Sequence, residues 1–211
     1  MKKPIVKLAA LAGATTASCV LTVAPAQAAP STVWTVSPSP AGVSLTNSVN
    51  LRLSVNGIAM TCTKSNGAAT LRSTTGNPAT AGRITSIAFG AAGAPCTTVL
   101  GNITLVPTAP WTFVAQDHTA STGVTQGYIG DIDMKLSVGA MVFRVQGKAS
   151  ATYTNATGRL TVENTVGELP ITESANSGAA FPVGASLLIK GDYLVKPTGT
   201  TAFMTIVGTN L

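Results

Sequence analysis

The stretch DIDMKLSVGAMVFRV, residues 131–145, carries the clearest structural pattern in the chain. Apolar residues recur at every second position on both sides of Gly139-Ala140, namely Ile132, Met134, Leu136 and Val138, then Met141, Phe143 and Val145. A period of two is typical of a β-strand with one buried face, and a pair of small residues is typical of a turn. We therefore predict two consecutive strands joined by a short turn, with a bulge where Gly147 interrupts the second.

The same pattern extends in both directions from this stretch. Asn56-Gly57, a strong signal for a two-residue hairpin, separates the alternating residues 49–55 from residues 58–62. A last strand containing Phe203, Thr205 and Val207 is expected to close the chain. About twelve short strands at intervals of 8–15 residues predict an all-β protein, an antiparallel β-sandwich or barrel-like fold with one disulfide.

Residues 1–28 have the pattern of a secretory signal peptide. Three lysines precede an apolar stretch at residues 8–23, and Ala26-Gln27-Ala28 forms an A-x-A cleavage site. We expect cleavage after Ala28, a secreted or extracellular bacterial protein, and a single all-β domain at residues 29–211. Two alternatives are a lipid-bearing Cys19 and a division of the domain near residues 118–123.

Charged residues make up only 9% of the chain, with 13 lysines and arginines against 7 acidic residues. Removal of Lys2, Lys3 and Lys7 with the leader leaves ten cations, which are scattered along the mature chain. A basic cluster is the usual feature of nucleic-acid binding, so nucleic acid is not an expected partner. No later segment is apolar for long enough to form a transmembrane helix after cleavage.

Of the three cysteines, Cys19 lies in the leader, which leaves Cys62 and Cys96. An even pair in an oxidising compartment predicts a disulfide, the alternative being two buried free thiols. Cys62 falls on the inward phase of its predicted strand.

Few residues are candidates for chemistry. Asp131 and Asp133 share one face of a strand and offer paired carboxylates for hydrolysis or a weak calcium site, with solvated aspartates as the simpler interpretation. His118 is the single histidine, and an exposed loop position is expected for it. Trp111 is a candidate platform for stacking a sugar, although core packing is more common for such a residue. No zinc or copper site and no cofactor are expected.

Several short stretches resemble secreted actinobacterial β-sandwich proteins of unknown function and, more distantly, exported proteins described as activators of alkane oxidation. The resemblance is carried by residues 60–63, 83–89 with Cys96, 109–111, 153–158 and 191–197. It implies an exported β-sandwich-like protein with a Cys62–Cys96 bridge and no assigned catalytic residue. The second group also implies contact with hydrophobic substrates or with the cell surface.

The leading functional hypothesis is a secreted, non-enzymatic β-sandwich protein that acts as a binding or cell-surface-associated module. Candidate partners are a cell-surface component, a carbohydrate or an apolar ligand. One alternative is an extracellular hydrolase that uses Asp131, Asp133 or His118. Another is a carrier for an apolar small molecule, which would require an internal apolar cavity.

Overall fold

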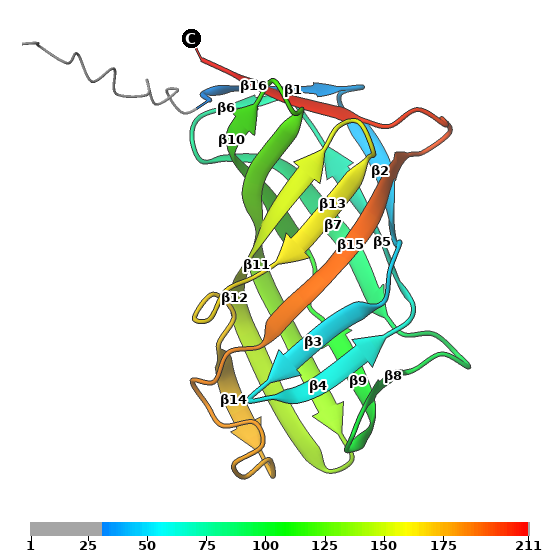
Figure 1. The fold of residues 1–211 in the computed structure, drawn as a ribbon, viewed down its shortest axis with the longest axis vertical. Helices are drawn as coiled ribbons and strands as arrows, with labels where there is room; N and C mark the ends of the chain where they lie inside the picture. Colours follow the sequence, from blue (N-terminus) through cyan, green and yellow to red (C-terminus); the bar gives the residue numbers. More distant parts are fainter. Residues whose placement is uncertain (1–30, 211) are drawn as a thin grey trace, which may run out of the picture.

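The computed structural model describes residues 31–210 and consists of strands and connecting loops (Figure 1). The predicted leader and its cleavage site lie outside the described residues. Sixteen strands lie within the described range rather than about twelve. They are β1 (Val33–Ser37), β2 (Ala41–Asn47), β3 (Leu51–Val55), β4 (Ile58–Cys62), β5 (Ser65–Leu71), β6 (Thr74–Thr75), β7 (Ala79–Phe89), β8 (Cys96–Thr98), β9 (Gly101–Pro107), β10 (Trp111–Thr119), β11 (Val124–Val138), β12 (Met141–Thr154), β13 (Arg159–Glu163), β14 (Ile171–Ala175), β15 (Leu188–Pro197) and β16 (Thr205–Thr209).

The all-β, antiparallel class predicted from the sequence is confirmed, with 13 strands in one sheet and 3 in a second. Within the described residues, no helix is long and apolar enough to cross a membrane. The predicted hairpin at Asn56-Gly57 joins β3 to β4, and both turn residues have the positive φ that a type I′ turn requires, 47° and 81°. Residues 118–123, a candidate domain boundary, instead form a hairpin between the paired strands β10 and β11.

The large sheet closes on itself because β11, β12, β13 and β15 take part in two rings of strands (Figure 1). In one ring, β2, β5, β7 and β10 connect β15 to β11. In the other, β3, β4, β8 and β9 connect the same two strands nearer the opposite end. The result is a tall, barrel-like closed sheet, so the barrel-like alternative describes the fold better than a sandwich of two separate sheets.

The longest strands, β11 and β12, form the predicted hairpin around Gly139-Ala140. A bulge lies on β11, where Gly130 and Asp131 together face Lys148 of β12. This extra residue changes the phase of alternation, so Ile129 and Ile132 both face the core. The bulge predicted at Gly147 is therefore present in the β11–β12 pair, but the extra residue lies on β11 and not on β12.

Gly147 itself is required for a close approach between chain segments. Its φ is +150°, and a Cβ at this position would lie 2.3 Å from the carbonyl oxygen of Glu168. The neighbouring Lys148 N–H donates a hydrogen bond to the same oxygen at 2.9 Å. A glycine here lets the connection after β13 lie directly against the edge of β12.

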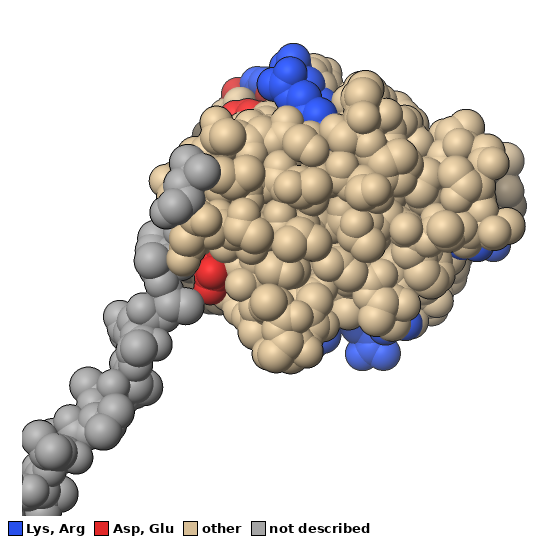
Figure 2. All heavy atoms as spheres, turned by 90° about the horizontal axis from the view of Figure 1, so that it is seen from above, with Lys and Arg blue, Asp and Glu red and all other residues tan. Residues whose placement is uncertain are grey.

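The three-stranded sheet of β16, β1 and β6 lies across one end of the closed sheet (Figure 1). The common core includes Trp34, Val36 and Ile206 of this sheet, together with Met204, which directly precedes β16. The buried residues of this last segment are Met204 and Ile206, whereas Phe203 and Thr205 are exposed. Both phases of the segment FMTIV contain large apolar residues, so alternation alone did not distinguish them. Viewed from above, this end carries few charged side chains (Figure 2).

The interior is filled by apolar side chains that belong to one continuous cluster from Trp34 to Ile206. A cavity of about 20 Å³ lies among them, lined mainly by aliphatic and aromatic residues. Pockets for small ligands usually measure about 300–1,000 Å³, so this cavity is far smaller than a carrier would need.

Cys62 of β4 and Cys96 of β8 form the predicted disulfide, and both residues are buried. The bridge joins positions 34 residues apart beside the β4–β8 pairing.

We predict that the double substitution of Cys62 and Cys96 by serine lowers the free energy of unfolding by about 3–4 kcal/mol, because the unfolded chain regains loop entropy. Urea unfolding of the oxidised protein, the reduced protein and the double variant measures this. An unchanged unfolding midpoint in both altered forms would contradict it.

Strand β16 forms, together with β1 and β6, a cap over one end of the closed sheet, and it is held there by Asn155 in the turn between β12 and β13. The Asn155 side-chain amide donates a hydrogen bond to the carbonyl oxygen of Ile206 at 3.0 Å and accepts one from the N–H of Ile206 at 2.8 Å.

We predict that Asn155→Ala lowers the free energy of unfolding by about 1–3 kcal/mol, because the Ile206 N–H loses its partner in a partly buried position. Asn102→Ala is the matched control, since Asn102 is exposed on β9. Equal unfolding midpoints for the two variants would show that Asn155 does not hold the cap.

Candidate functional site

The main polar cluster on the outer face lies across β9, β11, β12 and β14. Cross-strand pairing places Val106, Lys135, Arg144 and Glu173 in one row, and Asp133 stands two residues before Lys135 on β11. These side chains line a groove of about 610 Å³, together with Thr108, Val142, Phe143, Ser174 and Ala175. This volume lies within the range of pockets that bind small molecules.

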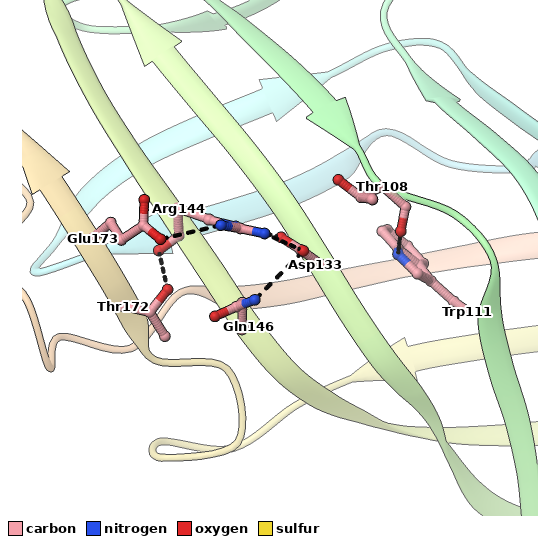
Figure 3. Close-up of polar contacts among 7 residues, drawn as sticks. All are labelled: Thr108, Trp111, Asp133, Arg144, Gln146, Thr172 and Glu173. Atoms are coloured by element: carbon pink, nitrogen blue, oxygen red, sulfur yellow. Dashed lines mark hydrogen bonds and ion pairs between the residues drawn. The ribbon is translucent and has the colours of Figure 1, made fainter.

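Arg144 is the centre of this cluster (Figure 3). Its Nε and Nη2 donate to the two oxygens of Asp133 at 2.7 and 2.5 Å, and its Nη1 donates to Glu173 Oε1 at 3.1 Å. The Gln146 amide adds a longer contact of 3.4 Å to Asp133. A two-pronged contact of this kind holds both planar groups in one orientation.

The cluster contains two cations, Arg144 and Lys135, and two carboxylates, Asp133 and Glu173, but only Arg144 forms ion pairs with the carboxylates. The hydrogen bonds from Arg144, followed by its positive charge, hold the pKa of Asp133 below its ordinary value against the opposing effect of burial. The same carboxylates raise the pKa of Arg144, which therefore stays protonated. Lys135 lies directly opposite Arg144 and makes no ion pair with any residue in the described range. The groove thus presents a fixed guanidinium–carboxylate plane with a free ammonium group beside it.

The sequence candidates Asp131, Asp133 and His118 do not form one constellation. The Asp131 carboxylate accepts a hydrogen bond from Thr112 Oγ1 at 2.9 Å, whereas Asp133 is held by Arg144. Both aspartates lie on the outer face, as their phase predicts, but with different partners. A hydrolase that pairs the two carboxylates is not supported by these contacts.

His118 lies near the cap rather than in an exposed loop. Its Nδ1 is 3.0 Å from Thr125 Oγ1, and that hydroxyl donates to the carbonyl oxygen of Ile206 at 3.1 Å. Because the hydroxyl proton is already used, His118 Nδ1 acts as the donor. Burial lowers the pKa of His118, and the charge of Asp117 opposes this effect. Thr125 is completely buried, so the pair supports the cap and does not present a nucleophile.

Trp111 is not the exposed platform that was considered for a sugar; it is packed in the core, the more common arrangement for such a residue. Trp111 is only 5% exposed and packs near Phe89, with ring centroids 6.4 Å apart. Its Nε1 donates to the carbonyl oxygen of Thr108 at 3.1 Å (Figure 3). The indole is therefore a core residue whose polar atom is satisfied by the preceding loop, and it offers no flat surface to a sugar.

No group of three or more histidine, cysteine or acidic residues suited to a metal ion occurs within residues 31–210. The groove residues Lys135, Arg144 and Glu173, and Gln146 beside them, were not candidates in the sequence. For Lys135, Arg144 and Gln146 the sequence did contain a signal, the two-residue turn at Gly139-Ala140. This turn sets the register that places Arg144 opposite Lys135 and Gln146 opposite Asp133. Glu173 is placed by the pairing of β12 with β14, for which the sequence showed no local signal.

Comparison with models of protein families, with curated proteins and with solved structures finds no match for this chain. The geometry of the described residues therefore carries the functional argument.

The lowered pKa of Asp133 leads to a pH-dependent contribution to stability. The ionised carboxylate favours the folded state, so its contribution is complete above the ordinary aspartate pKa of about 3.9 and is lost as the pH falls through the lower folded value. We predict that Asp133→Asn makes the loss of stability below about pH 4 less steep. Urea unfolding measured across this pH range tests it, with Asp117→Asn as the control. Identical pH profiles for Asp133→Asn and the unaltered protein would exclude this contribution.

Proposed function

We propose that the chain is a secreted, non-enzymatic binding module and that the groove across β9, β11, β12 and β14 binds a hydroxyl-rich ligand such as a carbohydrate. The observation that carries the proposal is the fixed Asp133–Arg144–Glu173 array inside a groove of about 610 Å³. A site that is already ordered before binding loses little entropy when the ligand arrives.

The array leaves both donors and acceptors available. A guanidinium group has five N–H bonds, and three of those of Arg144 are used by the two carboxylates. Lys135 supplies further donors, while the carboxylate oxygens retain free lone pairs. Sugar hydroxyls both donate and accept hydrogen bonds, so they match such a mixed surface better than a purely cationic or anionic group does.

The groove also has apolar borders. Val106 is 54% exposed at one side, and Val142 is half-buried in the neighbouring row. Exposed apolar residues beside fixed polar groups are the usual composition of a small-ligand site. They suit the C–H faces of a sugar ring, which pack against aliphatic side chains when no exposed aromatic residue is present.

The binding function is preferred over hydrolysis because of the state of Asp133. A general acid for glycoside cleavage needs a raised pKa, whereas Arg144 lowers that of Asp133. Both carboxylates next to Arg144 are engaged by it, which favours a structural and binding role. The small interior cavity likewise gives less support to a carrier of apolar molecules.

Secretion rests on the leader pattern of residues 1–28, and the Cys62–Cys96 bridge is compatible with an oxidising compartment. The resemblance to secreted actinobacterial proteins agrees with a role at the cell surface. We propose an envelope polysaccharide as the natural ligand, because it would be the commonest hydroxyl-rich polymer in that location.

Binding can be measured by titrating residues 29–211 with chitotetraose and with cellotetraose while following backbone amide NMR shifts. We expect shifts confined to β9, β11, β12 and β14, and we expect Lys135→Ala to weaken binding about five- to tenfold by removing a charged donor. Lys196→Ala is the control, because Lys196 is an exposed lysine of β15 that does not line the groove.

Two results would contradict the proposed function. One is the absence of shifts in the groove with either sugar at millimolar concentration, and the other is equal binding by Lys135→Ala and the unaltered protein. Release of shorter sugars during the titration would instead favour the hydrolase.

A further inference from the structure

A second groove, of about 480 Å³, lies on the outer face of β5, β7 and β10. Its lining includes two arginines, Arg72 and Arg83, and three threonines, Thr70, Thr80 and Thr112. The three strands are adjacent in the sheet, on the ring nearer the cap (Figure 1). This site shares no residue with the groove around Arg144.

Strand pairing explains why the arginines meet here. Arg83 of β7 lies opposite Thr70 of β5 on one side and opposite Thr112 of β10 on the other. Arg72 follows β5 directly, two residues beyond Thr70, and its backbone N–H donates to the carbonyl oxygen of Ala81 at 2.9 Å. Both arginine side chains are exposed, whereas the alternate residues Leu71 and Ile84 are buried.

Neither of these two arginines has an acidic partner within the described residues. The four ion pairs within the described residues involve Arg144, Arg159 and Lys190 as cations. Arg72 and Arg83 make no ion pair there, and their side chains make no hydrogen bond within the same residues. Two like charges in one groove repel each other, so a bound anion would relieve an unfavourable interaction.

An acidic group, that of Asp131, contacts the lining residue Thr112 at one border of the groove. Asp131 Oδ2 accepts the hydrogen bond of Thr112 Oγ1 at 2.9 Å, so the Thr112 hydroxyl is not free to donate to an anion. The negative charge of Asp131 also disfavours an anion close to β11. The remaining donors are the guanidinium groups of Arg72 and Arg83 and the hydroxyls of Thr70 and Thr80, which lie on β5 and β7.

We propose that the groove between β5 and β7 is a second binding site, selective for a tetrahedral oxyanion such as a phosphate group, with Arg72 and Arg83 as its principal ligands. Planar guanidinium groups bind two oxygens of one phosphate at the same time, and neighbouring hydroxyls donate to the others. The phosphate is either a free ion or part of an extracellular polymer, since the same oxygen atoms are recognised in both.

The test uses residues 29–211 at low ionic strength, titrated with inorganic phosphate and followed by amide NMR shifts. We expect shifts in residues 70–72 and 80–83. Arg72→Gln and Arg83→Gln should each weaken binding at least fivefold, and the double variant should abolish it. Arg52→Gln is the matched control, because Arg52 is also unpaired but lines a different groove, and it should bind phosphate like the unaltered protein. Thermal unfolding of each variant verifies that the fold is intact.

A parallel titration with short-chain sodium polyphosphate distinguishes the two sources of phosphate. Tighter binding per phosphate group, lost in the double variant, indicates a polymer as the ligand, whereas equal binding indicates the free ion. Unchanged phosphate binding in the double variant, an equal loss in Arg52→Gln, or no shifts in residues 70–72 and 80–83 would each overturn the proposal. Lys135→Ala should leave phosphate binding intact, which separates this site from the sugar groove.

Discussion

The pairing of β11 with β12 is the constraint on which the rest of the structure depends. These strands, of 15 and 14 residues, are the longest in the described chain, and both rings of the closed sheet pass through them. Most inner residues of the pair contribute to the common core, so a shift of register by one position would expose Phe143, Val145 and Met134 together. The two-residue turn fixes the register and so prevents that shift. The bulge at Gly130 and Asp131 changes the phase of alternation along β11, so that apolar residues on both sides of the bulge face the core.

Closing the sheet also determines where polar chemistry can occur. The interior is occupied by apolar side chains, which leaves the outer face for charged and hydroxyl groups. Two outer grooves differ in their electrostatics. Around Arg144 the charges neutralise one another and form a rigid hydrogen-bonding plane, whereas Arg72 and Arg83 stand without acidic partners. In a chain with so few charged residues, this contrast favours different ligands for the two surfaces.

Several elements were predictable because their residues alternate strongly. The Asn56-Gly57 hairpin, the β11–β12 hairpin and the inward orientation of Cys62 follow from local pattern alone. Four of the sixteen strands, β2, β6, β8 and β14, were not predicted, and for β2 and β14 the reason is equally local. β2 has only two large apolar residues, Val43 and Leu45, beside a proline-rich segment, and β14 has a single buried residue, Ile171. Their strand conformation comes from pairing with β5, β15 and β12.

What the sequence determined by itself was the β class, the short turns, the disulfide pair and the low charge, because each depends on neighbouring residues or on composition. Only the tertiary structure decided that Trp111 is buried, that Met204 and Ile206 rather than Phe203 face the core, and that Arg144 joins Asp133 to Glu173. These outcomes depend on which strands become neighbours when the sheet closes. Contacts of this kind link residues far apart in the chain, and alternation along a single strand contains no information about them.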